Sequence, residues 1–85
     1  MKLRSSDLSW QEVDGELVVL DLKSSKYLAT NASGTVLVKQ LTEDRSQAEL
    51  AQALVEAFGI SQSQATHDVL GFVTELDRSG LLERS

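Results

Sequence analysis

The sequence predicts one α+β domain of winged-helix-turn-helix-like type, in which a three-stranded antiparallel sheet is followed by three helices. The hydrophobic pattern changes once, near Asn31, from the two-residue alternation of strands to the spacing of amphipathic helices. Turn sequences divide the part before this point, and capping and glycine signals divide the part after it. The 85 residues contain no proline and no linker-like tract, so we assign residues 1–85 to a single domain.

The first part of the chain has the pattern of a β-meander. Leu8–Val13 is a candidate strand, and the Asp14-Gly15 dipeptide after it is a strong hairpin signal. The next strand spans Leu17–Leu22, and a polar turn over residues 23–26 leads to a short third strand, Tyr27–Thr30. Tight connections imply antiparallel pairing, and a sheet with one apolar face needs a helical layer to cover it.

Two helices are expected next. Asn31 is a suitable N-cap for a helix that runs to about Leu41. Ser46 and Glu49 have the S-x-x-E spacing of a capping box, in which each side chain satisfies a backbone N–H. The helix that this box opens is expected to end at Gly59, because glycine readily adopts the left-handed conformation of a C-cap.

A third helix should start after Ser61 or Ser63 and run to about Ser79, with Gly80 as its stop. Residues 81–82, both leucine, are expected to fold back onto the core. The main apolar stripe of this helix consists of Ala65, Val69, Phe72, Val73 and Leu76. Leu70 widens the stripe on one flank.

Composition narrows the class of function. The net charge is −5, from 13 acidic and 8 basic residues, which disfavours nucleic acid as a partner. No cysteine is present, so disulfides, thiolate zinc sites and thiol nucleophiles are excluded. The longest apolar stretch, Leu17–Leu20, is too short to cross a bilayer, and the amino terminus lacks a signal-peptide pattern. We therefore expect a cytoplasmic protein without a membrane partner.

Three segments together resemble the PqqD-like family. They are Val-Val-Leu-Asp-Leu at 18–22, Lys-Tyr-Leu-Ala-Thr-Asn-Ala-Ser-Gly at 26–34, and Leu-Asp-Arg-Ser-Gly-Leu-Leu-Glu at 76–83. The resemblance extends from Leu8 to Glu83. Members of that family are small winged-helix domains that act as recognition elements for ribosomally synthesised, post-translationally modified peptides. The resemblance implies a peptide-binding protein with no cofactor, no metal and no enzymatic activity.

Within the family, the chain looks most like the leader-binding proteins of lasso-peptide pathways, because it has Tyr27 on the third strand and an acidic balance. There the precursor's leader peptide is bound, and the core is presented to a leader peptidase and an ATP-dependent macrolactam synthetase. Related stand-alone members serve the pyrroloquinoline-quinone and sactipeptide pathways. Those pathways remain alternatives.

The resemblance also implies a binding site, in which the leader adds as a strand to the third strand and faces the third helix. We expect Leu70 and Val73 to flank the groove, with Phe72 and Leu76 mainly in the core. Tyr27 and Leu28 must face opposite ways, and the sequence does not decide which one faces the groove. The residues carried over from the family are Lys26, Tyr27, Leu28, Ala29, Thr30, Val69, Leu70, Val73 and Leu76.

A DNA-binding winged helix is the nearest alternative. Its recognition helix would be Ser61–Ser79, which holds one arginine, Arg78, against three acidic residues. An enzyme would need His67, the sole histidine, paired with Ser63; Asp68 points roughly 100° away from it on a helix and cannot orient it. A small adaptor or dimerisation module with an unrelated partner is the third alternative.

Overall fold

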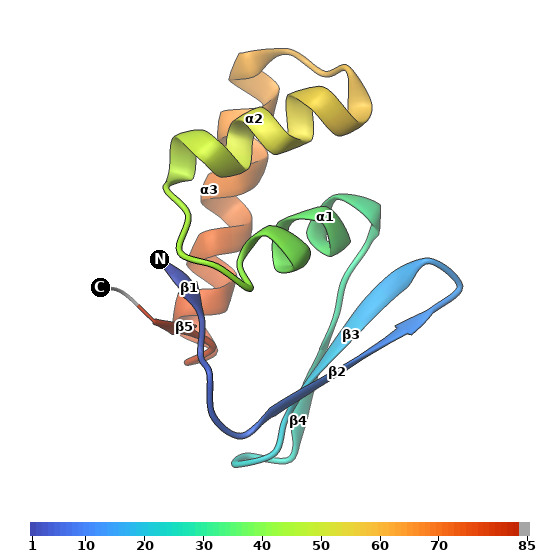
Figure 1. Ribbon diagram of the computed structural model, residues 1–85, viewed down its shortest axis with the longest axis vertical. Helices are drawn as coiled ribbons and strands as arrows, with labels where there is room; N and C mark the ends of the chain where they lie inside the picture. Colours follow the sequence, from blue (N-terminus) through green and yellow to red (C-terminus); the bar gives the residue numbers. More distant parts are fainter. Residues whose placement is uncertain (84–85) are drawn as a thin grey trace.

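The computed structural model describes residues 1–83 and has the predicted α+β architecture, with three helices over one face of a three-stranded sheet (Figure 1). Residues 84 and 85, which our single-domain assignment included, lie outside the described residues. None of the helices described is long and apolar enough to span a bilayer. The elements are β1 Lys2–Leu3, β2 Leu8–Val13, β3 Glu16–Asp21, β4 Lys26–Ala29, α1 Ala32–Gln40, α2 Gln47–Phe58, α3 Gln62–Arg78 and β5 Leu82–Glu83.

The main sheet has the strand order β2-β3-β4 and is antiparallel throughout, as predicted. Asp14 and Gly15 connect β2 to β3 with φ angles of 54° and 80°. Two consecutive positive φ values are the geometry of a type I′ turn, which matches the right-handed twist of the paired strands. The third strand is shifted by one residue from the expected Tyr27–Thr30 and spans Lys26–Ala29.

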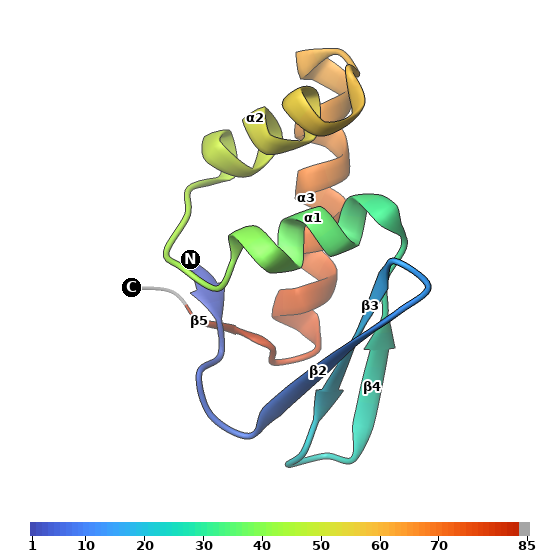
Figure 2. The ribbon, with the colours of Figure 1, turned by 45° about the vertical axis from the view of Figure 1, so that its right-hand side comes forward.

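The helices lie on one side of this sheet and leave its other side uncovered (Figure 2). Leu17 and Val19 of β3 are buried beneath the helices, whereas Leu20 is exposed on the opposite side. This division follows from the two-residue alternation of a strand.

The capping predictions are confirmed. The Asn31 side chain accepts a hydrogen bond from the Gly34 N–H (2.9 Å), which starts α1. Ser46 and Glu49 form the reciprocal capping box of α2. Gly59 is left-handed and ends this helix. Of the two serines considered for α3, Ser61 is the N-cap.

The core lies between the three helices and the inner face of the sheet. Leu81 is buried, so the predicted return of the chain after α3 is confirmed. The buried apolar residues are Leu17, Val19, Leu37, Val38, Leu41, Leu50, Ala51, Leu54, Ala65, Val69, Val73, Leu76 and Leu81.

A second sheet, which the sequence did not predict, joins the two ends of the described chain. β1 pairs with β5 in antiparallel register, Lys2 opposite Glu83 and Leu3 opposite Leu82. The Leu3 N–H also donates to the Leu41 carbonyl (2.9 Å), and the Arg4 N–H donates to the Leu81 carbonyl (2.8 Å). A strand of two residues has no periodicity to detect, so only the tertiary pairing defines it.

Two helical glycines should respond oppositely to alanine. At Gly71 an added Cβ would meet nothing within 4 Å, so Gly71→Ala should raise the free energy of unfolding by about 0.5–1 kcal/mol through helix propensity. At Gly34 the Cβ would lie 2.9 Å from the Thr30 Cβ and 3.0 Å from the Phe72 Cε1. There the overpacking should outweigh the propensity gain and lower the free energy of unfolding by about 1 kcal/mol or more. Urea denaturation of both variants checks this, and equal shifts would contradict it.

Candidate functional site

β4 forms one edge of the main sheet, and its outward backbone groups follow from the pairing on its other side. The Thr30 N–H donates to the carbonyl of Leu17 (2.9 Å), which is opposite it when the β3–β4 register is continued by one residue. Successive residues of an antiparallel strand direct their N–H and C=O groups to opposite sides. Tyr27 and Ala29 therefore direct theirs away from β3. An extended peptide could pair with these groups.

The two side chains whose orientation the sequence left open are now assigned. Leu28 is half-buried and packs against the core from the helical side of the sheet. Tyr27 is 72% exposed and lies on the opposite side. Leu28 is thus the residue of this pair that faces α3.

A hollow of about 340 Å³ lies between β4 and the C-terminal half of α3. Its apolar part comes from Val19, Leu28 and Leu81, and its polar rim comes from both elements. The rim residues are Asp21, Ser24, Lys26, Tyr27, Glu75, Arg78 and Ser79. The hollow adjoins the free edge of β4, so a peptide added to that edge could place alternate side chains in it.

Asp21, one of the rim residues, forms an ion pair with Arg4. The Arg4 Nη2 donates to the Asp21 Oδ1 (2.7 Å), and the Arg4 Nη1 donates to the Gly80 carbonyl (2.8 Å). The hydrogen bond from Arg4 lowers the pKa of the Asp21 carboxyl, so Asp21 remains ionised at neutral pH. Arg4 in this way ties the N-terminal segment to the sheet and to the end of α3.

A second hollow of about 400 Å³ continues along α3 towards its N-terminus. Glu75 lines both hollows, so the two adjoin at this residue, and we call the pair of hollows the trough. Gly71 lies in the wall of the second hollow, where a Cβ would meet open space. The other lining residues are Asn31, Ser33, Gly34, Leu37, His67, Asp68 and Phe72.

None of the four α3 positions predicted to bind the peptide lines the trough. Val69, Val73 and Leu76 are buried in the core. Val73 was expected to flank the groove, but it is only 2% exposed. Leu70 is 55% exposed but lines neither hollow. Phe72, expected mainly in the core, is half-buried and lines the second hollow. The physical reason is the helical period: the most apolar face of α3 is fully used by the core, and its neighbouring face borders the trough.

Thr30 is engaged at the joint between the sheet and α1. Its Oγ1 donates to the Leu17 carbonyl (2.7 Å) and lies 3.0 Å from the Thr35 Oγ1. The Thr35 Oγ1 in turn accepts from the Leu17 N–H (2.9 Å). Thr30 thus continues the pairing of β4 with β3 by one residue, and its side chain is engaged within the protein.

Several residues that border the trough were missed by sequence reasoning. Asp68, Glu75 and Arg78 have the appearance of an ordinary solvated helix face. The one available signal was Gly71, since a glycine inside an amphipathic helix usually has a packing or functional reason.

The carboxylate of Asp68, the acid next to His67 in the sequence, is engaged by another side chain. The Asp68 Oδ1 accepts a hydrogen bond from the Gln64 Nε2 (2.8 Å), so it is turned along the helix towards Gln64. Within residues 1–83, no three histidine, cysteine, aspartate or glutamate side chains lie close enough together to hold a metal ion.

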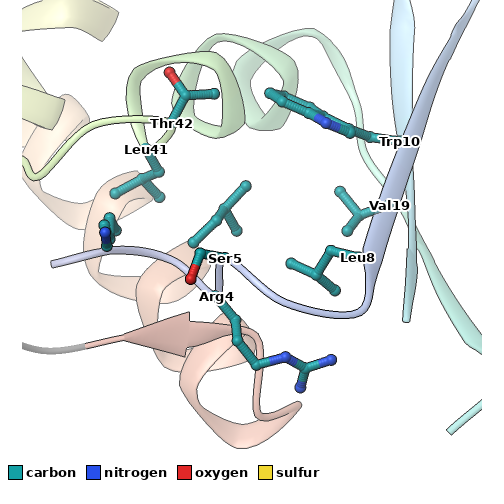
Figure 3. A pocket seen from close by; sticks show the side chains of 9 residues that line it. Arg4, Ser5, Leu8, Trp10, Val19, Leu41 and Thr42 are labelled. Carbon is teal, nitrogen blue, oxygen red and sulfur yellow. The ribbon is translucent and has the colours of Figure 1, made fainter. Parts of the chain in front are cut away.

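A separate pocket lies near β2, on the inner side of the sheet (Figure 3). Leu8, Trp10 and Val19 form its sheet wall, and Leu41 lies opposite them at the end of α1. The Arg4 side chain points away from this pocket, towards Asp21. The pocket therefore belongs to the packing of the N-terminal segment against the sheet.

Comparison with known proteins connects the chain to one family and to two solved structures. The family model described as coenzyme PQQ synthesis protein D (PqqD) matches residues 16–82. Among solved structures, TbiB1 in complex with the TbiA(beta) leader peptide is 25% identical with a TM-score of 0.87, covering 100% of this chain and 98% of that chain. A lasso peptide synthetase B1 complexed with the leader peptide is 28% identical with a TM-score of 0.82, covering 98% and 96%. No curated protein matches the chain.

The Arg4–Asp21 pair predicts a pH dependence. Since Arg4 lowers the pKa of Asp21 below its ordinary 3.8, the pair stabilises the fold above that value, and its contribution is lost as pH falls through the folded-state pKa. In Arg4→Gln, the pKa of Asp21 should rise towards 3.8, and stability should fall less steeply in acid. Carboxyl NMR titration of Asp21 measures this. Arg78→Gln is the control, because Arg78 lies near Glu75 rather than Asp21 (3.7 Å between Nη1 and Oε2); identical Asp21 titrations in wild type and Arg4→Gln would contradict the assignment.

Proposed function

Because the chain belongs to the PqqD family, we propose that it binds the leader segment of a ribosomally made precursor peptide, in a lasso-peptide pathway. The observation that carries the proposal is the free edge of β4 beside the trough, in a fold shared over its whole length with two leader-bound proteins. The lasso setting is supported by the description of one of these as a lasso peptide synthetase B1.

The leader adds to the sheet as a further strand. Its backbone pairs with the outward N–H and C=O groups of Tyr27 and Ala29, which set the register. Each such hydrogen bond contributes only about 0.5–1.5 kcal/mol net, so pairing alone gives weak and unselective binding. One apolar side chain buried against Leu28 would contribute about 1.5–3 kcal/mol more. Specificity therefore comes from the leader side chains that enter the trough.

The charges of the rim favour some leader side chains over others. Lys26 lines the hollow from β4, and Arg78 lines it from α3. Glu75 lies beside Arg78, with 3.7 Å between the Glu75 Oε2 and the Arg78 Nη1. Lys26 would attract an acidic leader residue. The carboxylate of Glu75 reduces the attraction of Arg78 for such a residue, because it already lies near the guanidinium. We propose Lys26, Tyr27, Leu28, Ala29, Glu75 and Arg78 as the binding residues.

The bound leader is then presented to partner enzymes in the cytoplasm. These are a leader peptidase and an ATP-dependent macrolactam synthetase, as in the pathways that the chain resembles. The protein contributes recognition and not chemistry, in keeping with its membership of the PqqD family.

A second candidate is leader binding in another PqqD-like pathway, which the description of the family as coenzyme PQQ synthesis protein D favours. The two settings differ in the peptide that binds. A titration with the leader of a lasso precursor and with a quinone-pathway precursor separates them, and duplex DNA serves as a third titrant to test the regulator alternative.

Strand addition predicts that a proline at Ala29 blocks binding without unfolding the protein. The Ala29 N–H points away from β3, so Ala29→Pro removes no bond of the ladder, and proline is tolerated on such an edge. The affinity of the protein for the leader of a lasso precursor should fall about tenfold or more, because an N–H donor at the edge is lost and the proline ring obstructs pairing. Calorimetric titration measures it.

The matched control is Ala29→Thr, which keeps the N–H and suits a strand. Thermal unfolding followed by circular dichroism establishes that both variants fold. If Ala29→Pro folds and binds the leader as wild type does, the leader does not pair with the β4 edge.

Filling the second hollow tests how far the leader extends along α3. Gly71→Leu places a side chain in open space, so the fold should tolerate it while the hollow is occluded. Leader affinity should fall about fivefold to tenfold if a leader side chain of ordinary apolar size is displaced from the hollow. Gly71→Ala is the control and should bind as wild type does. Unchanged binding by Gly71→Leu would restrict the site to the hollow beside β4.

A further inference from the structure

The second hollow lies beside the end of β4. A Cβ added to Gly34, which lines this hollow, would lie 2.9 Å from the Thr30 Cβ and 3.0 Å from the Phe72 Cε1. Thr30 continues the pairing of β4 with β3 by one residue. A leader strand that extends along β4 as far as Thr30 therefore reaches the second hollow.

The register of the sheet decides which leader side chain points towards this hollow. Alternate residues of a strand place their side chains on the same side of the sheet. Leu28 packs against the core from the helical side, so Thr30 lies on that side as well. Directly opposed residues of paired strands also share a side. The leader residue opposite Thr30 thus directs its side chain towards the helices, two positions along from the leader residue that packs against Leu28.

The second hollow is negatively charged. Asp68 and Glu75 are the lining residues that carry a charge at pH 7. The Asp68 Oδ1 accepts from the uncharged amide of Gln64 (2.8 Å), and Asp68 forms no ion pair with another residue of the described chain, 1–83. Glu75 has Arg78 on its far side, at 3.7 Å. The charge of Asp68 is therefore available to a cation that enters the hollow.

The N-terminus of α1 also borders the second hollow and has the opposite sign. A helix N-terminus is equivalent to roughly half a positive charge. Its Gly34 N–H is already bound by the Asn31 side chain (2.9 Å), so this donor is not available to an anion. The carboxylates of Asp68 and Glu75 each carry a full charge and outweigh the helix terminus.

The walls of the second hollow suit a long side chain. Phe72 is half-buried and presents an apolar, aromatic surface to it. Gly71 leaves open space next to that surface. Lysine and arginine combine an apolar stem with a charged head. Such a side chain can pack its stem against Phe72 and place its head near Asp68.

We propose that the second hollow binds the side chain of a lysine or arginine of the leader, and that Asp68 and Glu75 select it. This proposal rests on the proposed function. The basic residue lies opposite Thr30, and the apolar residue two positions away packs against Leu28. Two positions further, opposite Lys26, the charge favours an acidic residue. The bound leader therefore presents basic, apolar and acidic side chains at alternate positions.

The test is a double-mutant cycle between the protein and the leader of a lasso precursor, measured by calorimetric titration. Each lysine and arginine of the leader is replaced singly by methionine, which keeps an apolar stem and removes the charge. One replacement should weaken binding to the wild type about threefold to fivefold at low salt, as for a solvent-accessible ion pair, and less at high salt. In Asp68→Asn, which keeps the acceptor for Gln64, the same replacement should have no effect.

Two further variants separate recognition from a general effect of charge or structure. Glu56→Gln is the control, because Glu56 is exposed on α2 and lines neither hollow, and it should respond to the leader replacement as wild type does. In Asp68→Lys the preference should reverse, so that a leader with glutamate in place of the basic residue binds more tightly than the unchanged leader. A merely structural role of Asp68 would not produce this reversal.

The outcomes distinguish this proposal from the proposed function. If the wild type does not bind the leader, the proposed function fails, and this proposal fails with it. If the wild type binds the leader but no basic residue of the leader couples to Asp68, the assignment of the second hollow is overturned while leader binding stands. The same holds if Asp68→Lys folds, as judged by circular dichroism, and keeps the preference of the wild type.

Discussion

The burial of one side of β3 is the constraint on which the rest of the structure depends. β3 is the central strand, and it pairs with β2 on one side and β4 on the other. Leu17 and Val19 must lie beneath the helices, because they supply the sheet's share of the core. A shift of the pairing by one residue would expose them and bury Leu20. Their burial therefore decides which side of β3 faces the helices, and the observed pairing of Val19 with Leu28 and of Leu20 with Tyr27 extends the same two sides to β4.

From this register the candidate site follows. It turns Leu28 towards α3, leaves Tyr27 on the opposite side, and directs the backbone of Tyr27 and Ala29 to the open edge. Main-chain groups at a sheet edge can pair with any extended peptide. In the proposed function, selection among leader side chains falls to the hollows beside α3. The Arg4 contacts with Asp21 and Gly80 connect the sheet to the segment that follows α3.

The third strand lies at an edge of the sheet, as expected, whereas the residues expected to face the peptide from α3 do not line the trough. In the proposed function the backbone of β4 pairs with the leader, so this part of the proposal depends on the strand and its edge position and not on its side chains. On α3 the apolar stripe marks the core, and Val69, Val73 and Leu76 are buried there. The trough is bordered instead by Asp68, Gly71 and Glu75, whose polar or small character does not distinguish a groove from a solvated surface. Which helical face borders a groove depends on where the sheet lies, and the helix's own sequence does not contain that information.

The sequence by itself determined what depends on residues close together in the chain. The Asp14-Gly15 turn, the Asn31 N-cap, the capping box of α2 and the end of α2 at Gly59 each involve contacts within about four residues, so their local chemistry was sufficient. Only the tertiary structure decided the pairing of β1 with β5, the side of the sheet on which Tyr27 lies, and the face of α3 that borders the trough. These depend on contacts between distant segments. The physical reason is that a local pattern states that a side chain needs burial or a partner, and packing decides which distant residue provides it.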